Sequence, residues 1–484
     1  MLIIITILVY FLLLIAYSRI VTGRRSDNDV FFRAGRKSPW YMVAFGMVGA
    51  SISGVTFVSV PGMVNTIGMT YMQTCLGFIL GYVLVAFVLL PIYYKYNLIT
   101  IYSYLEQRLG SDAYKTGASF FLVSKMIGAA VRFYVVCMIL QRFVFDDLGI
   151  PFIVTVVGLV FCIWIYTRRG GIKTLVWTDT LQTVCMLAAL TMIVAKVVGA
   201  LDMSFSQAVT AVVADERSRW FVFDDPVSKQ YFWKQFLSGI FIVIVMTGLD
   251  QDMMQKNLTC KSLRDAQKDM CTYGVAFVPV NLLFLFLGVL LSLLCQKEGL
   301  PMPVSGDELL PMFAASGRLG ESVVVLFTIG IVAASFSSAD SALTSMTTSY
   351  CIDIRGKADD EAFRKKAHVV LAIVFGVIIL VVNAAGSRNI IDVIYTICGY
   401  TYGPLLGLFV FARFMGNKKA TLRGGFVWAV CVLSPLLCFL LNSFTSSQWD
   451  YNFGYELLMV NGVITFVGLL LIQKSLSLKS RHAA

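Results

Sequence analysis

The chain has 484 residues, of which 58% are hydrophobic and only 14% are charged, and its mean hydropathy is strongly positive. A soluble domain could not bury so much apolar surface, so the composition excludes soluble enzymes and soluble binding modules and indicates lipid as the solvent. In a soluble protein a net charge of +11 would suggest a nucleic-acid partner. Here the basic residues follow the predicted loops of a membrane protein, so we expect no nucleic-acid partner.

Long uncharged apolar runs mark the membrane spans. A helix needs about 20 apolar residues to cross a hydrocarbon layer about 30 Å thick, so such runs can be counted. The sequence predicts thirteen spans. Their approximate limits are 2–20, 40–64, 71–94, 117–141, 150–167, 175–199, 232–254, 271–295, 321–350, 367–386, 390–412, 424–442 and 454–472.

The flanks of the spans indicate the orientation of the chain. The first run, MLIIITILVYFLLLIAYSRI, has no basic residue before its apolar stretch and no small-residue cleavage site, so we expect a retained helix and not a signal peptide. Most of the 39 lysines and arginines fall in alternate loops on one side, among them TRRGGIK, QKNLTCKSLRDAQK and RGKADDEAFRKK. The positive-inside rule then predicts a multi-pass protein of the cell (inner) membrane with its N-terminus outside and its C-terminus in the cytoplasm.

Cysteine and histidine form no metal or disulfide pattern. The 11 cysteines are scattered singly, without CxxC pairs, and are expected to be small packing residues. Both histidines, His368 and His482, fall at the predicted cytoplasmic margin. We therefore expect no zinc or haem site.

The order of the spans predicts a single membrane transporter domain over residues 1–484. All loops are short except 201–231 and 296–320, which leaves no room for a separate soluble domain. The second to sixth and the seventh to eleventh spans form two sets of five, and an odd number per set requires the second set to run inverted. The predicted parts are an extra leading helix at 1–22, a first inverted repeat at 40–200, a second at 231–414 and two trailing helices at 424–473.

The lead helix of each predicted repeat carries an interruption near mid-membrane. The segments are VGASISGVT at 48–56 and MTGLDQD at 246–252. Broken helices expose backbone groups that can hold ions and solutes, and inverted repeats are typical of transporters. Glycine is common in membrane helices, so each interruption alone is a weak signal, but their matching positions strengthen both.

Small polar residues line one face of the ninth predicted span, in ASFSSADSALTS at 334–345. Offsets of three and four residues place five positions on that face. They are Ala334, Ser337, Ser338, Ser341 and Ser345. Sodium is a hard cation that prefers oxygen ligands, and paired hydroxyls with the free carbonyls of a broken helix could supply them. Close approach of two helices through small residues is an equally good interpretation of this stretch alone.

Two carboxylates fall inside predicted spans, Asp340 in the ninth and Asp179 near the start of the sixth. An unpaired charge there costs at least about 2.5–3.5 kcal/mol, so such residues usually face a partner or a pathway. Asp179 could instead be shallow enough to contact water. Asp250 and Asp252, in the second interruption, could cap or brace the broken helix without binding anything.

Three basic residues also fall inside spans. Lys196 lies near the outer end of its helix and is expected to extend its ammonium to the surface. Lys125 and Arg132 are seven residues apart on one face of the fourth span, with Arg132 near mid-depth. An arginine fork is suited to a bidentate carboxylate. A structural ion pair with an acidic residue such as Asp340 is the alternative.

Several strings together resemble the sodium/solute symporter family, whose members carry sugars, proline, pantothenate or sialic acid with sodium. They occur in family order from about residue 27 to 415 and are DNDVFFRAGRKSPWYMV, ASISGVTFVSVPG, ITIYSYLEQRLG, RRGGIKTLVWTDTLQ, GLDQDMMQKNLTCKSLRDAQK, SFSSADSALTS and GYTYGPLLGLF. The ordered set is highly specific. The resemblance implies an all-α integral membrane protein with the leucine-transporter fold, in which inverted five-helix repeats follow one extra leading helix.

The resemblance also implies sodium ligands. The principal site would use the carbonyls of Gly49, Ile52 and Ala334 and the hydroxyls of Ser337 and Ser338. Some family members hold a further sodium ion, and the matching positions here are Asp179, Ser337, Asp340 and Ser341. Asp340 stands where those members have a hydroxyl, so the resemblance leaves open whether one or two sodium ions are coupled to transport.

Solute-binding positions implied by the resemblance are Ser53, Thr56, Tyr71, Cys75 and Asp250. The sugar-carrying branch has an acidic residue where this chain has Cys75, which argues against glucose-type recognition. The sialic-acid branch is more similar, because it uses polar residues that match Ser53 and Thr56 and an arginine that aligns with Arg132, although it tends to have glutamine at Cys75. The expected solute is a small polar organic anion such as sialic acid or another carboxylate, and a neutral sugar, amino acid or vitamin is the alternative.

The expected activity is sodium-coupled uptake by alternating access. Sodium entering from outside would fix the second span against the ninth and favour the outward-open state, and solute would then close the outer path. A membrane enzyme would need a cluster of His, Asp or Glu at one interface, and the sequence shows none. A channel would need a filter-like segment, and none is visible in the sequence. A non-transporting solute sensor on the same fold usually carries a long cytoplasmic extension, which this chain does not show. Sodium is the expected cofactor, and solute and lipid are the expected partners of a chain that functions as a monomer.

Overall fold

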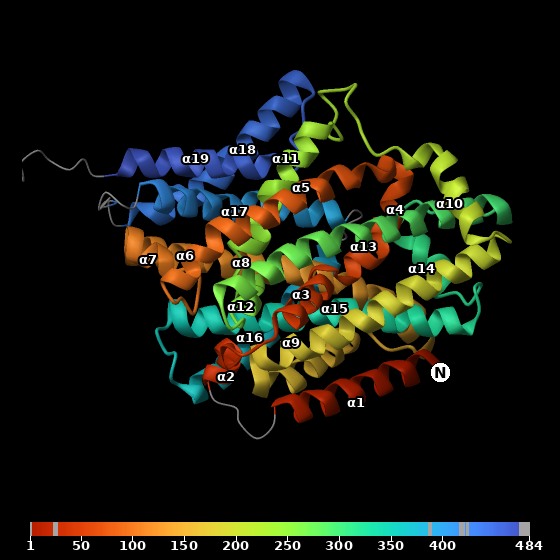
Figure 1. Ribbon diagram of the computed structural model, residues 1–484, viewed down its shortest axis with the longest axis horizontal. Helices are drawn as coiled ribbons and strands as arrows, with labels where there is room; N and C mark the ends of the chain where they lie inside the picture. Colours follow the sequence, from red (N-terminus) through yellow and green to blue (C-terminus); the bar gives the residue numbers. More distant parts are fainter. Residues whose placement is uncertain (1, 23–27, 386–389, 416–421, 423–424, 474–484) are drawn as a thin grey trace, which may run out of the picture.

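The computed structural model describes residues 2–22, 28–385, 390–415, 422 and 425–473 (Figure 1). Parts of the predicted basic loops, at 23–27, 416–421 and 423–424, lie outside the described residues, as does the C-terminal basic segment with His482. The bounds of the α-helices are α1 (Leu2–Thr22), α2 (Asn28–Arg33), α3 (Trp40–Ser51), α4 (Gly54–Ile67), α5 (Tyr71–Leu84), α6 (Leu90–Lys95), α7 (Ser103–Leu109), α8 (Ser111–Leu140), α9 (Phe152–Ala200), α10 (Phe205–Ala214), α11 (Phe232–Val243), α12 (Gln251–Asn257), α13 (Leu263–Glu298), α14 (Leu309–Ala314), α15 (Glu321–Ser349), α16 (Glu361–Ala385), α17 (Ile390–Phe414), α18 (Phe426–Trp449) and α19 (Leu457–Ile472).

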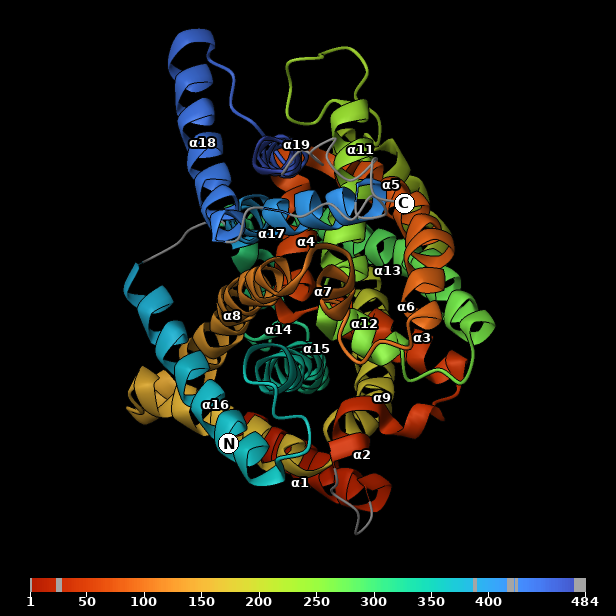
Figure 2. The same cartoon turned by 90° about the vertical axis from the view of Figure 1, so that its left-hand side faces the viewer.

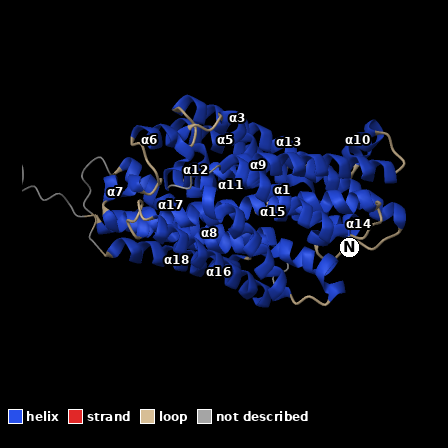
Figure 3. Cartoon of the chain, turned by 90° about the horizontal axis from the view of Figure 1, so that it is seen from below, coloured by secondary structure: helices blue, strands red, loops and turns tan. Residues whose placement is uncertain are grey.

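Short 3-10 and π-helical segments join or extend these helices. They are η1 (Ala34–Arg36), η2 (Gly68–Thr70), η3 (Val85–Leu89), η4 (Gln141–Phe145), η5 (Asp146–Leu148), η6 (Glu216–Ser218), η7 (Ile244–Gly248), η8 (Gly306–Glu308) and η9 (Tyr350–Ile354). The described part of the chain contains no β-strand (Figure 3). An all-α fold suits a chain in lipid, because each helix satisfies its own backbone hydrogen bonds.

The helices agree with a multi-pass membrane protein. Within the described residues nine helices are long and apolar enough to cross a membrane, or ten if α11 and α12 count as one bent span. A helix overlaps each predicted span, but Trp40–Ser51, Phe152–Arg168 and Leu457–Ile472 are only 10–17 residues long. The exact count of thirteen spans therefore stays a prediction.

Both predicted interruptions are present. α3 ends at Ser51 and α4 begins at Gly54, and between them Ile52 and Ser53 have extended backbone with ψ of 90° and 170°. In the second case η7 extends α11 to Gly248, and α12 is then inclined to this helix by 69°. Both breaks are buried, so each places free helix ends inside the protein.

The fifth and sixth predicted spans join in one long helix, α9, that kinks at Gly171. Gly171 has φ of 48° and ψ of −133°, a conformation that side-chain-bearing residues rarely adopt. A Cβ atom at this position would also lie 2.6 Å from the ring of Phe31 on α2. The glycine of the TRRGGIK string therefore permits both the turn between the two halves of α9 and the contact with α2.

Helix α15 is the central element of the bundle. Figure 2 looks along α15 and shows α8, α9 and α16 around it. α15 packs against α9, α8, α1, α3 and α4, and from Val323 to Ser349 almost every residue is buried. In contrast, α18 exposes large apolar side chains, as expected for a helix that faces lipid. The serine-rich face predicted from the sequence thus lies in the interior, beside the first break.

Candidate ion and solute site

The first break directs the C-terminal end of α3 toward α15. The last carbonyls of a helix have no intrahelical N–H donor. The hydroxyl of Ser338 on α15 donates to one of them, the carbonyl oxygen of Ala50, at 2.9 Å. The same hydroxyl is 3.2 Å from the carbonyl oxygen of Ala334. Side-chain and backbone oxygens of two helices therefore meet at this junction.

The groups at this junction suit a sodium ion. The predicted ligands Gly49 and Ile52 lie on either side of Ala50 in the chain, and Ile52, Ala334 and Ser337 are buried. Hydroxyl and carbonyl oxygens are the ligands that hard cations prefer, and the C-terminal end of a helix carries partial negative charge. The donor set fits the predicted principal sodium site, and the role of these residues as ligands stays a prediction.

The second break has its free carbonyls already satisfied. The hydroxyl of Tyr93 donates to the carbonyl oxygen of Gly248 at 2.7 Å, and the hydroxyl of Tyr102 donates to that of Leu249 at 3.0 Å. Asp250 caps the N-terminus of α12, where its carboxylate accepts from the Asp252 amide at 2.8 Å. Since phenol groups and a cap occupy these positions, the first break is the better cation site of the two.

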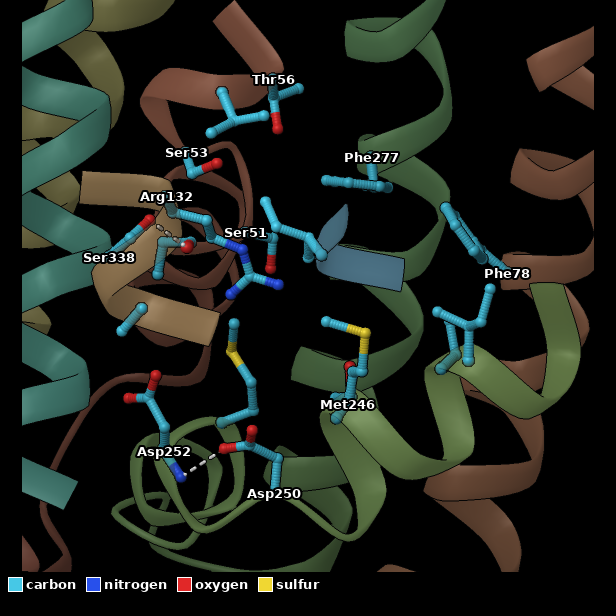
Figure 4. Close-up of a pocket in the computed structure, with 18 of the residues that line it drawn as sticks. Ser51, Ser53, Thr56, Phe78, Arg132, Met246, Asp250, Asp252, Phe277 and Ser338 are labelled. Carbon is cyan, nitrogen blue, oxygen red and sulfur yellow. Dashed lines mark hydrogen bonds between the residues drawn. The ribbon is translucent and has the colours of Figure 1, made fainter. Parts of the chain in front are cut away.

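A cavity lies between the two breaks and is bordered by α4, α5, α8 and α13 (Figure 4). Figure 4 shows the guanidinium of Arg132 pointing into it. Among the described residues Arg132 has no ion-pair partner. The alternative of an ion pair with Asp340 is wrong, because Asp340 instead accepts a hydrogen bond from the Tyr166 hydroxyl at 2.6 Å. A cationic fork in a partly buried cavity is suited to an anion.

Most predicted solute residues line this cavity. They are Ser53, Thr56, Tyr71, Arg132 and Asp250. Cys75 is fully buried and does not line it. The rings of Tyr71 and Phe78, which flank Cys75 on the same helix face, contact each other edge to face with centroids 6.3 Å apart, so the short thiol side chain does not reach the cavity. The structure thus brings together the predicted solute residues of the first break, α4, α5, α8 and the second break, but not Cys75.

Lys125 forms ion pairs with the two aspartates that line one end of the cavity. Its ammonium lies 3.2 Å from Asp250 and 2.7 Å from Asp252, and all three side chains are buried. Asp250 also accepts from the hydroxyl of Tyr402 at 2.7 Å. The carboxylate of Asp250 is therefore engaged by a cation, a phenol and a backbone amide, which agrees with the bracing role considered for it from the sequence.

Some cavity residues were not predicted. Tyr273 and Phe277 on α13 and Met246 in η7 also line the cavity. Tyr273 joins three helices, because its hydroxyl contacts that of Tyr82 at 2.7 Å and that of Ser51. Aromatic and apolar side chains are common in every membrane helix, so nothing in the sequence distinguished these three.

A sequence profile described as the sodium:solute symporter family matches residues 31–431. The chain belongs to the sodium:solute symporter family. This membership confirms the family that the ordered strings resemble, and with it a multi-pass membrane transporter and sodium as the ion.

Individual relatives of this symporter are distant. The human "Sodium/iodide cotransporter" is 25% identical over 419 residues, which are 83% of this chain and 64% of that protein, so the chain spans less than two thirds of its length. The "Sodium/sialic acid symporter NanT" of Aliivibrio fischeri is 24% identical over 464 residues, 92% of this chain and 88% of NanT.

Solved structures confirm the fold of this symporter. A Na+-coupled sialic acid symporter in a substrate-bound outward-open state has a TM-score of 0.82 at 19% identity and covers 98% of this chain and 99% of its own. The nucleobase-cation-symport-1 family transporter Mhp1 in a closed conformation has a TM-score of 0.57 at 14% identity, with coverages of 93% and 95%. The predicted leucine-transporter-like fold is therefore confirmed.

The residues implied for a second sodium ion in this symporter lie together but contain a fixed cation. Ser337 donates to one oxygen of Asp179 at 2.8 Å, and the ammonium of Lys256 is 2.7 Å from the other. Asp179 and Lys256 are fully buried, so the possibility that Asp179 contacts water is wrong. Asp340 and Ser341 are buried on the same helix as Ser337.

Lys256 was placed in a cytoplasmic loop by its basic flanking sequence, and this placement is wrong. After the break, α12 continues for seven residues and carries Lys256 inward against α9. The signal that could have found it was Asp179 itself, because a carboxylate inside a predicted span usually faces a partner or a pathway.

Proposed function

We propose that this protein is a sodium-coupled symporter that imports a small polar organic anion by alternating access, and that it acts as a monomer in the cell (inner) membrane with its N-terminus outside. The observation that supports an anion is Arg132, whose guanidinium points into the cavity beside the first break and forms no ion pair with any residue that the structure describes. A carboxylate, such as that of sialic acid, matches the planar fork of an arginine with two parallel hydrogen bonds.

The names of several relatives agree with an anionic solute, because they refer to iodide, sialic acid and monocarboxylates, which are all anions at neutral pH. Other relatives are named as multivitamin transporters, which keeps a vitamin among the alternatives. These solutes belong to proteins that are at most 25% identical to this chain. These solutes are therefore candidates to be tested in a binding screen of this protein.

Sodium and solute would act at neighbouring positions on the first break. Ala50 and Ser338 belong to both the ion junction and the cavity wall. A sodium ion between α3 and α15 would hold Ser53 and Thr56 in place for the solute, so that ion binding precedes solute binding. Closure of the outer path and opening of the inner one would then proceed by movement of α3, α4, α11 and α12, the helices that contain the breaks.

A thermal-shift screen tests this function. The purified full-length protein would be heated with N-acetylneuraminic acid, lactate, iodide, glucose or proline, each in sodium and in choline buffer. We expect an acid to raise the melting temperature in sodium only, because ligand binding to the native state stabilises it by mass action. Stabilisation by glucose or proline without any acid effect would instead support the neutral-solute alternative.

Arg132→Ala should remove the stabilisation by the acid and keep the stabilisation by sodium. Arg142→Ala is the matched control, since Arg142 is exposed and its guanidinium pairs with Glu308 at 2.7 Å. Sodium-independent behaviour of the unmodified protein in both binding and proteoliposome uptake would reject the proposed function.

A further inference from the structure

A buried cluster beside the principal sodium junction contains its own cation. Asp179 on α9, Ser337 and Asp340 on α15 and Lys256 on α12 make up this cluster. The side chains of Asp179 and Lys256 are 0% and 2% exposed. An ammonium group with so little exposure cannot exchange with water while the helices stay packed.

The two oxygens of Asp179 are both in use. Oδ1 accepts from the Ser337 hydroxyl at 2.8 Å, and Oδ2 contacts the Lys256 ammonium at 2.7 Å. These are two of the groups that a second sodium ion would need. A sodium ion bound to Asp179 would lie next to the Lys256 ammonium, and two like charges on one carboxylate repel each other.

Other carboxylates also face Lys256. Asp252 and Asp340 lie close enough to interact electrostatically with its ammonium. Asp252 is paired with Lys125 at 2.7 Å, and Oδ2 of Asp340 accepts from the Tyr166 hydroxyl. Oδ1 of Asp340 has no hydrogen-bond partner in the described part of the chain. Lys256 thus pairs with Asp179 and lies near two further acidic side chains.

We propose that the Lys256 ammonium permanently takes the place of a second sodium ion, so that this symporter binds and couples one sodium ion only. The inference rests on the proposed sodium coupling and deepens it. The ammonium also differs from an ion in mechanism. It is covalently part of α12, the inner half of the second broken helix, and here joins α12 to Asp179 on α9, whereas a sodium ion at the first break would bind and dissociate in each cycle.

Counting bound sodium tests this proposal without knowledge of the solute. Purified full-length protein would be dialysed to equilibrium against increasing ²²Na⁺, with choline as the replacing cation, and the saturating number of ions per chain would be determined. We expect one ion for the unmodified protein. Ser338→Ala should abolish saturable binding, and Asp179→Asn should leave one ion bound.

Removal of the ammonium should open the second position. Lys256→Ala is expected to bind two ions, and Lys256→Ala with Asp179→Asn to bind one again. Lys256→Arg, which keeps the charge, should bind one ion. Lys297→Ala is the matched control, because Lys297 is an exposed lysine that pairs with Asp202 at 2.5 Å, and it should bind one ion.

The outcomes separate the two proposals. Two ions on the unmodified protein, one of which is lost in Asp179→Asn or Asp340→Asn, would overturn this inference and leave sodium coupling intact. A single ion on a well-folded Lys256→Ala would also overturn it. Absence of saturable sodium binding to the unmodified protein would reject the proposed function itself. If Lys256→Ala does not fold, the counts for the unmodified protein and Asp179→Asn still decide.

Discussion

Ser338 connects the two helices that the first break brings together. Its hydroxyl is within 2.9 Å of the Ala50 carbonyl and 3.2 Å of the Ala334 carbonyl. Ser338→Ala removes one of the oxygens expected to bind sodium, so we predict that sodium no longer raises the melting temperature of the purified protein. A buried hydroxyl on the same helix, that of Ser345, donates to the Ala342 carbonyl at 3.0 Å and to no other described residue, and Ser345→Ala should retain the response. An unchanged sodium response in Ser338→Ala would contradict the assigned ion junction.

Gly49 allows α3 to lie directly against α9. A Cβ atom on Gly49 would lie 1.9 Å from Oγ1 and 2.9 Å from Cβ of Thr183. Gly49→Ala should therefore destabilise the protein by about 1–3 kcal/mol, the usual cost of overpacking, and weaken sodium binding by displacing the carbonyls that follow.

Thermal unfolding in detergent, with and without sodium, measures both effects of Gly49→Ala. Gly158→Ala on the exposed face of α9 is the control, because nothing lies within 4 Å of a Cβ atom there. Equal melting temperatures for the two variants would show that α3 and α9 tolerate a wider separation.

The stability of the second broken helix depends on the ion pairs of Lys125. The buried ammonium joins α8 to Asp250 and Asp252 at the start of α12. Lys125→Met leaves two buried carboxylates without this cation, and removal of one partner of a buried pair costs about 3–5 kcal/mol. We predict a large loss of thermal stability in Lys125→Met and partial recovery in Lys125→Met with Asp252→Asn. Recovery should be absent if the loss arises from packing alone.

The interruptions could be predicted because they are local. VGASISGVT and MTGLDQD concentrate glycine and polar residues within a few positions of an apolar run, and the structure breaks α3/α4 and α11/α12 there. The partners that satisfy each break could not be predicted. Tyr93 and Tyr102 reach the carbonyls of Gly248 and Leu249 from about 150 residues away, and the sequence has 21 tyrosines from which to choose.

For the whole molecule, one bound sodium ion and one monovalent anion make a neutral load. Each net charge moved across a membrane potential of 100 mV contributes about 2.3 kcal/mol, which corresponds to about a 50-fold change in accumulation. We predict that a potential of 100 mV, negative inside, leaves the sodium-driven accumulation of the acid found by thermal shift unchanged in proteoliposomes. A second coupled sodium ion would instead raise that accumulation about 50-fold.

Hydropathy and charge made the membrane fold predictable, since lipid tolerates few alternatives to apolar helices. The serine face of α15 and its position beside the first break followed from helical spacing and from the family strings. Lys256 was missed because its neighbours are basic and polar, and only the fold shows that Asp179, 77 positions earlier, lies 2.7 Å away. Cys75 failed as a cavity residue because the contact of Tyr71 with Phe78 depends on side-chain conformation, which spacing does not encode.

The two breaks differ in what holds them. At the second, phenol groups of Tyr93 and Tyr102 and the ammonium of Lys256 are parts of the chain and cannot dissociate. At the first, the hydroxyl of Ser338 donates to the Ala50 carbonyl at the end of α3, and the proposed sodium ion would bind there and dissociate again. The conformation of the second break is therefore held by the polypeptide itself. The conformation of the first break would instead depend on the sodium concentration on the side of the membrane to which it is open.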